Sequence, residues 1–212
     1  LITGQRVNGW RRNGDGVSLF LEGAETRARQ LVIAAGAWTP KLVPSVAHLL
    51  RPERQVVAWF SVNNDAAFAP ERFPIFVLQT PDGYFYGFPQ HGVPGFKIGK
   101  YHHRAEVVDP DGMNRLVDAD DEAVLRTCVT SVFPYADGPV IRSSTCIFTN
   151  TPDEHFIIDR LPEAPEVLLV SACSGHGFKF CSVVGEVVAD LVTRGDTRHD
   201  LSLFRLTRFL GR

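Results

Sequence analysis

The order of apolar and polar positions predicts a sheet-forming N-terminal segment. Leu1–Val7 has the composition of a strand, and the turn residues Asn13–Gly16 precede a second apolar run, Val17–Leu21, which is the pattern of a β-hairpin. The apolar run Leu31–Trp38 then ends in small residues, as is typical of a buried strand whose end lies close to another backbone or a ligand. We therefore expect a β-meander that leads into a buried strand of a larger α/β sheet.

The middle of the chain has short apolar runs separated by turn residues, which favours an antiparallel sheet. One helix is expected over Asp118–Phe133, because acidic residues begin it, apolar residues recur on one face, and Pro134 follows it. The expected strands are residues 51–60, Ile75–Gln79, Tyr84–Phe88, Gly95–Gly99 and Val140–Phe148.

The last third returns to an α/β pattern. Phe156–Asp159 and Val167–Ala172 are predicted strands, and Phe178–Thr193 is a predicted helix that Gly195 ends. The fold class is therefore α/β with an α+β mixture: one sheet system is split by an inserted antiparallel domain. The expected domains are residues 1–44 and 149–212 for the split unit and residues 45–148 for the insert.

Composition narrows the classes of function. The chain has 212 residues, of which 44% are hydrophobic and 22% charged, as in ordinary globular proteins. A net charge of −2 gives no reason to expect nucleic acid or an anionic membrane as partner. No apolar run reaches the length of a membrane span. The four cysteines form no CxxC pair, so we expect no disulfide framework, no zinc or other metal site, and a reducing cytoplasm.

The first residue is Leu1 rather than methionine, and no GxGxxG fingerprint precedes the first buried strand. That fingerprint is the turn that cradles the phosphates of a dinucleotide. Our interpretation is that the chain is a C-terminal piece of a longer protein.

The run from Ser174 to Phe180 carries the strongest local signal. Gly175 and Gly177 flank His176 where a predicted strand meets a predicted helix, and Lys179 follows. Glycines allow a sharp turn and a close approach to a flat ligand, and the start of a helix offers free N–H groups. This arrangement suits an anionic or electron-accepting ligand; the alternative is a glycine-rich turn with a solvent-exposed lysine.

Several longer stretches carry a resemblance to a known family. They are Val32–Trp38, Tyr84–Pro89, Gly95–Gly99 and the run from Cys146 through Lys179. The chain resembles the C-terminal half of monomeric sarcosine oxidases and N-methyltryptophan oxidases, which are flavin-dependent amine oxidases of the D-amino-acid-oxidase-like superfamily. The resemblance implies part of an FAD-binding, Rossmann-like domain that is split by an antiparallel substrate domain.

The resemblance also implies the cofactor and the residues that hold it. FAD is expected to be bound covalently through Cys146 in the complete enzyme, since a thiolate is a good nucleophile. The alternative for Cys146 is a small buried hydrophobic residue. The other expected cofactor-binding residues are Gly36, Ala37, Trp38, Ser174, Gly175, His176, Gly177, Phe178 and Lys179.

Four side chains are expected to act in catalysis. The resemblance implies that Lys97 promotes the reaction with O₂ as a buried cation and that Lys179 binds the substrate carboxylate. Tyr86 is expected to donate a hydrogen bond to the substrate, and His102, or alternatively His103, to line the site. The alternatives are that Lys97 is an edge-strand lysine, that Lys179 is a surface lysine, and that Tyr86 is an ordinary aromatic residue of the sheet. For His102 and His103, the alternative is two solvated loop histidines.

The function that follows from the resemblance is FAD-dependent oxidative demethylation of a small N-methyl amino acid. O₂ would be the acceptor, and the products would be an aldehyde and hydrogen peroxide. The complete protein is expected to act as a monomer, and the 212 residues alone to be incomplete and inactive. Two alternatives stay open: another amino-acid oxidase or dehydrogenase of the same superfamily, or a truncated fragment without catalytic activity.

Overall fold

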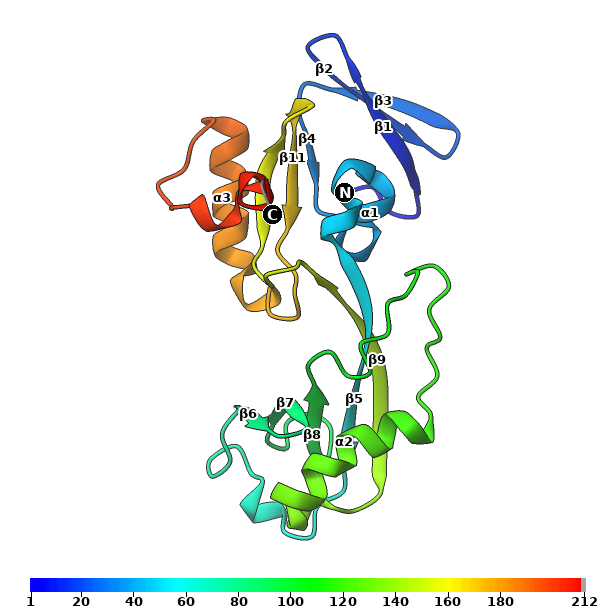
Figure 1. Cartoon of the computed structure of the whole chain (residues 1–212), viewed down its shortest axis with the longest axis vertical. Helices are drawn as coiled ribbons and strands as arrows, with labels where there is room; N and C mark the ends of the chain where they lie inside the picture. The colour runs from blue at the N-terminus through cyan, green and yellow to red at the C-terminus, as the bar shows by residue number, and fades with distance from the viewer. Residues whose placement is uncertain (211–212) are drawn as a thin grey trace. The chain divides into compact units, whose positions relative to one another are not determined.

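A computed structural model describes residues 1–210 and divides the chain into two units. Unit 1 combines Leu1–Arg51 with the chain from Thr149 onward, and unit 2 is Pro52–Phe148. Strands β5 (Arg51–Phe60) and β9 (Val140–Asn150) carry the chain between the units (Figure 1). The first boundary follows Arg51 rather than residue 44, because Val46, Leu49 and Leu50 are buried in the core of unit 1.

Unit 1 contains two three-stranded sheets. The antiparallel meander consists of β1 (Val7–Asn13), β2 (Gly16–Leu21) and β3 (Ala24–Ala28). The expected strand over Leu1–Val7 is wrong: the exposed residues 1–6 have no regular structure, and the strand begins at Val7.

The second sheet of unit 1 has the order β10–β11–β4. Strand β4 (Leu31–Ile33) is parallel to β11 (Ala164–Ser171), and β10 (Ile157–Leu161) is antiparallel to it. Helix α3 (Cys181–Thr193) lies beside this sheet (Figure 1) and buries Val187 and Leu191 against it. The parallel pair and its helix confirm the predicted α/β character.

Three predicted bounds in unit 1 differ from the structure. The strand expected over Leu31–Trp38 ends at Ile33, because the chain turns into the 3₁₀ turn η1 (Gly36–Trp38). Strand β11 begins at Ala164 rather than at Val167. The final helix begins at Cys181, after the 3₁₀ turn η5 (Phe178–Phe180).

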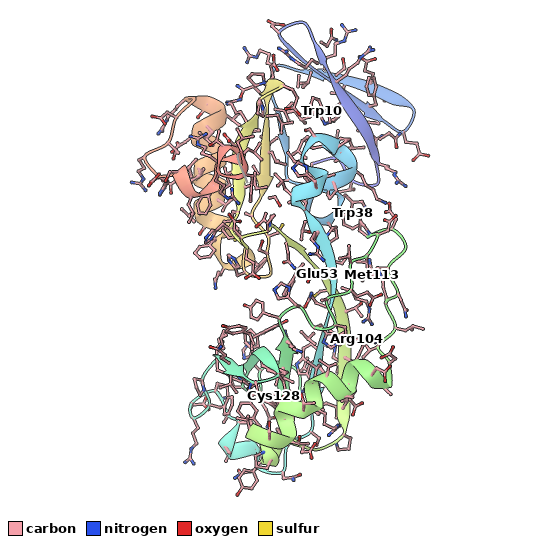
Figure 2. All side chains as sticks on the ribbon, viewed as in Figure 1. Trp10, Trp38, Glu53, Arg104, Met113 and Cys128 are labelled. Carbon is pink, nitrogen blue, oxygen red and sulfur yellow. The ribbon has the colours of Figure 1, made fainter. Side chains whose placement is uncertain are left out.

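Unit 2 is a five-stranded sheet with one helix. Its order is β6–β7–β8–β5–β9, and the pairs β6–β7, β7–β8 and β8–β5 are antiparallel, as predicted. The remaining elements are β6 (Phe76–Thr80), β7 (Gly83–Phe88), β8 (Phe96–Lys100) and α2 (Ala119–Val132). Cys128 lies on α2 (Figure 2) and is buried with Leu125 and Val129 against one face of the sheet.

The short helical segments connect these elements. They are α1 (Thr39–Leu42), η2 (Pro44–Leu49), η3 (Asp65–Ala67), η4 (Pro134–Ala136), η6 (Ser202–Phe204) and η7 (Leu206–Phe209). In the part of the chain that the structure describes, no helix is long and apolar enough to cross a membrane.

A buried ionic cluster joins strand β5 to helix α2. The Arg54 guanidinium donates to both carboxylate oxygens of Asp121 at 2.9 and 2.7 Å, and these side chains are 3% and 0% exposed. His103 Nε2 lies 3.0 Å from Asp121 Oδ1. Burial alone would raise the pKa of Asp121, but the hydrogen bonds from Arg54 hold it well below its ordinary value.

Asp121 also belongs to the start of α2. The Asp118 carboxylate accepts the backbone N–H of Asp121, and Asp121 accepts the backbone N–H of Asp118. This reciprocal pair is a capping box. One acid of the first turn that predicted the helix, Asp121, therefore has two functions. It caps the helix and it also binds Arg54.

Arg54→Met should lower the free energy of unfolding of unit 2 by about 3–5 kcal/mol, because it leaves the buried Asp121 carboxylate with only the partly exposed Arg104 as a cation, 3.5 Å away. Urea unfolding followed by circular dichroism measures the loss. The control is Arg126→Met, which removes the partly exposed pairs of Arg126 with Glu122 and Asp137 and should cost about 1 kcal/mol or less. Equal losses in the two variants would contradict the prediction.

Candidate active site

The face of the unit 2 sheet opposite α2 carries three of the predicted site residues. Side chains alternate along a strand, and Val56, Ala58 and Phe60 of β5 point into the core. Trp59 therefore lies on the opposite face, where it pairs with Lys97 of β8. We call this surface the lysine face and define it by Trp59, Tyr86, Lys97, Gly99 and Cys146.

Lys97 lies between two aromatic rings. Its Nζ is 4.9 Å from the ring centroid of Trp59 and 5.0 Å from that of Phe88, while its neighbours Phe96 and Ile98 are fully buried on the core side. The predicted alternation is confirmed, but Lys97 is half-buried rather than buried. Among residues 1–210 it has no carboxylate partner, so its charge is available to a ligand on this face.

Tyr86 covers strand β8 because residue 99 is a glycine. A Cβ atom at Gly99 would lie 2.6 Å from the Tyr86 ring, which is too close for any real side chain. Tyr86 also packs edge to face on Tyr101, with ring centroids 5.1 Å apart. Burial raises the pKa of the Tyr86 hydroxyl, so this group stays protonated and acts as a hydrogen-bond donor.

Cys146 is a free, half-buried cysteine in β9. Burial raises the pKa of its thiol, and the charge of Lys97 acts in the opposite direction. The charge of Cys146 in turn contributes to the raised pKa of Tyr86. Tyr86, Lys97 and Cys146 therefore lie close enough to influence one another electrostatically, although they come from three different strands.

The structure separates the roles of the two adjacent histidines. His103 is buried in the cluster with Arg54 and Asp121, and burial lowers its pKa. The His102 side chain is 43% exposed, and its Nδ1 lies 2.9 Å from Glu53 Oε2. The His102 ring is thus the more exposed of the two, while His103 is held in the core.

The glycine turn of unit 1 has an unusual backbone. Ser174 and Gly175 have φ angles of 51° and 75°, in the left-handed region that favours glycine. A Cβ atom at Gly177 would lie 1.7 Å from the carbonyl oxygen of Ala172. Gly177 is therefore required by the turn itself, and Ser174 is buried, with its Oγ accepting the backbone N–H of Thr151.

The other residues of this turn point in different directions. His176 stacks on Phe156 with centroids 4.9 Å apart, and its Nε2 lies 3.0 Å from the carbonyl oxygen of Glu154. Phe178 is exposed. Lys179 is also exposed, lies in the turn η5 rather than inside the helix, and has its Nζ 5.5 Å from the Phe180 ring centroid.

A mainly apolar pocket of about 420 Å³ opens beside Lys179 and His176, under the start of α3. Elsewhere in unit 1, Gly36 has a φ of 52°, Ala37 is buried, and Trp38 is 42% exposed (Figure 2). Within unit 1, the structure thus brings together the predicted residues of the glycine turn. Within unit 2, it brings together Tyr86, Lys97 and Cys146.

Glu53 and Trp59 were not among the residues predicted from the sequence. Both are on β5 at positions that alternate with buried core residues, so a strict reading of the two-residue period over 51–60 would have placed them on the face that bears Lys97.

Among residues 1–210, no group of three or more histidine, cysteine, aspartate or glutamate side chains could hold a metal ion.

Comparison with known proteins gives one family over most of the chain. The model of the family described as "FAD dependent oxidoreductase" matches residues 1–191. The chain is 43% identical to monomeric sarcosine oxidase of Bacillus sp. (strain NS-129) over 185 residues, which cover 85% of this chain and 48% of that protein. It is 34% identical to N-methyl-L-tryptophan oxidase of Citrobacter koseri over 209 residues, which cover 96% of this chain and 54% of that protein.

The fold is also similar to that of a solved structure. The amino acid oxidase NikD aligns with a TM-score of 0.73 and 22% identity over 95% of this chain and 54% of that one. The chain spans about half the length of the curated relatives it matches.

The proximity of Lys97 and Cys146 can be measured by thiol chemistry on the flavin-free chain. Because Lys97 lowers the pKa of the Cys146 thiol, Lys97→Met should slow alkylation of Cys146 by iodoacetamide at pH 8 by roughly two- to tenfold, as a rise of up to about one pKa unit would give. Peptide mapping by mass spectrometry distinguishes Cys146 from the other cysteines. Lys100→Met is the control, because Lys100 lies over Phe85 on the core side; an equal effect there would refute the proximity.

Proposed function

The chain belongs to the FAD dependent oxidoreductase family, and from this membership we propose that its protein oxidises the N-methyl group of a small amino acid. FAD would be the cofactor and O₂ the electron acceptor, and the products would be the demethylated amine, an aldehyde and hydrogen peroxide. The observation that carries the proposal is the lysine face, where a thiol, a hydroxyl donor and a lysine without a carboxylate partner lie together.

The residues present fit a flavin. An electron-rich, flat ring system needs nearby cations and hydrogen-bond donors that are not already neutralised. Lys97 and Lys179 have no carboxylate partner among the described residues, and the Tyr86 hydroxyl stays protonated. When bound, FAD supplies the two-electron oxidation of the carbon next to nitrogen and the return of those electrons to O₂.

Cys146 is the proposed point of covalent attachment. Its position in β9 beside Lys97 supports this role, because a nearby cation favours the thiolate that forms a thioether. Burial opposes the thiolate, so attachment requires that Lys97, or the bound cofactor itself, favours ionisation.

Lys97 is the proposed activator of O₂. The rings of Trp59 and Phe88 hold its ammonium group without cancelling its charge. A fixed cation stabilises the negative charge that develops when an electron passes to O₂. Tyr86 donates a hydrogen bond from the same face, and we propose that its acceptor is the substrate.

Roles in binding are also proposed for the residues of the unit 1 turn. Lys179 is an exposed cation beside a mainly apolar pocket and would bind the substrate carboxylate as a point charge. Gly36, Ala37, Trp38 and the segment Ser174–Phe178 would contact the cofactor. The ring of His176 is held by Phe156 and Glu154, so its proposed contribution is to hold the shape of the turn.

The substrate is proposed to be sarcosine-like, as the names of the matched relatives suggest. The proposal also includes a monomer, as the names of the matched sarcosine oxidases suggest, in the cytoplasm, in line with the four free cysteines. The alternative is another amino-acid oxidase or dehydrogenase of the same superfamily. Peroxide production in an oxygen-electrode assay separates the oxidases from a dehydrogenase.

Cys146→Ser should abolish covalent attachment of the flavin, because a serine hydroxyl is a far weaker nucleophile than a thiol. The flavin of the parent protein should stay with the protein after acid precipitation, and that of the variant should remain in the supernatant. Cys181→Ser, at an exposed cysteine, is the control and should keep the flavin attached. Flavin that still precipitates with Cys146→Ser would refute the assignment.

Lys97→Met should slow reoxidation of the flavin by O₂ by roughly 100-fold or more, as the loss of one preorganised electrostatic group does. Reduction of the flavin by the N-methyl amino acid should change much less. Stopped-flow absorbance measures the two half-reactions separately, with Lys100→Met as the control. Equal slowing of both half-reactions in Lys97→Met would exclude a specific role with O₂.

A further inference from the structure

A second cation lies on the lysine face, beside the same ring that contacts Lys97. The guanidinium carbon of Arg142 is 5.3 Å from the ring centroid of Trp59, and Lys97 Nζ is 4.9 Å from that centroid. The three residues come from β9, β5 and β8, which are neighbours in the sheet with β5 in the middle. One indole ring is therefore shared by two positive charges.

The direction of the Arg142 side chain follows from the alternation along β9. The next residue, Ser143, lines a small pocket together with Val56 of the core and Leu125 of α2, so it points to the helix side of the sheet. Arg142 must then point to the lysine face, in agreement with its contact with Trp59. It is separated by an even number of positions from Cys146, which lies on the same face.

Neither of these cations is neutralised within the part of the chain that the structure describes. Neither Lys97 nor Arg142 forms a salt bridge there, and no protein oxygen accepts a hydrogen bond from the Arg142 guanidinium. A guanidinium has five N–H donors, which an aromatic ring cannot satisfy. The two charges also repel each other, because their groups lie no farther apart than the two centroid distances taken together. An anion between them would remove this repulsion.

The groups present favour a carboxylate as that anion. The planar N–H fork of an arginine matches the two oxygens of a carboxylate. The rings of Trp59 and Phe88 on either side of Lys97 suit the hydrocarbon part of a small organic acid better than a strongly hydrated phosphate. We infer that Arg142, Trp59 and Lys97 form a binding site for a small carboxylate, in which the Arg142 fork takes both oxygens and Lys97 supplies the second positive charge.

A carboxylate in this site changes the charge beside Lys97. In the proposed function, that charge stabilises the negative charge that develops on O₂, and a bound carboxylate opposes it. Small carboxylates should therefore slow the reoxidation of the flavin. This consequence rests on the proposed function, whereas the binding site itself does not.

Three variants separate the parts of the site. Arg142→Met removes the fork and its charge, Arg142→Lys keeps the charge without the fork, and Lys97→Met removes the second charge. Arg11→Met is the matched control, because Arg11 is an exposed strand arginine whose guanidinium carbon also lies 5.3 Å from a ring centroid, that of Phe20, but in unit 1. Far-UV circular dichroism checks that each variant is folded.

The first readout is binding of acetate to the flavin-free protein, which does not depend on activity. Fluorine-19 NMR of protein labelled with 5-fluorotryptophan follows Trp59, whose signal is identified by its loss in Trp59→Phe. Sodium acetate replaces sodium chloride at constant ionic strength. The Trp59 signal should shift and saturate in the parent and in Arg11→Met. Arg142→Met should weaken acetate binding by roughly tenfold or more, and Arg142→Lys and Lys97→Met by roughly three- to tenfold.

The second readout is reoxidation of the reduced, flavin-loaded protein by O₂ in stopped-flow experiments. For each protein, the rate in saturating acetate is divided by the rate in chloride of the same ionic strength. Acetate should slow the parent and Arg11→Met by roughly three- to tenfold, through the loss of electrostatic stabilisation. In Arg142→Met the two rates should be nearly equal.

The outcomes distinguish this inference from the proposed function. A Trp59 signal that responds equally to acetate and chloride, or equally in Arg142→Met and the parent, would overturn the carboxylate site. Saturable binding with no slowing of reoxidation would overturn the consequence for O₂. If the reduced parent protein does not react with O₂ even in chloride, the proposed function fails, and the fluorine signals alone decide whether the site exists.

Discussion

The buried pair of Arg54 and Asp121 is the interaction on which unit 2 depends. It joins the interior strand β5 to the first turn of α2, and Asp121 caps that helix at the same time. His103 adds the 101–105 turn to the same carboxylate. One carboxylate thus fixes a strand, a helix and a turn, and the turn bears the accessible His102. Because the charges are buried, losing either partner leaves the other with only a longer ion pair to a partly exposed side chain, Arg104 for Asp121 and Glu106 for Arg54.

The alternation of side chains along β5 and β8 places core residues on one face of the sheet and proposed site residues on the other. One face of the sheet packs Phe60, Phe96 and Ile98 against α2, and the other carries Trp59 and Lys97. Glycine at position 99 lets the Tyr86 ring lie directly on the backbone of β8. The aromatic surface that holds Lys97 is therefore supported by a core that contains none of the proposed catalytic groups.

Much of the fold could be predicted because its signals are local. The acidic first turn and apolar face of α2, the strands around Lys97, and the presence of β11 and α3 follow from periodicity and turn residues. The start of α3 and the short β4 were misjudged, because glycines and small residues at 34–37 and 175–177 allow turns that apolar periodicity cannot detect. Glu53 was missed for another reason: its partner His102 is 49 residues away in sequence, and only the fold brings the two together.

The raised pKa of Cys146 affects how readily peroxide oxidises its thiol. Peroxide oxidises thiolates far faster than thiols, and an oxidase of the proposed kind releases peroxide at its own active site. In the proposed oxidase, a Cys146 thiol that burial keeps protonated would therefore be oxidised more slowly by the product peroxide than an ionised one.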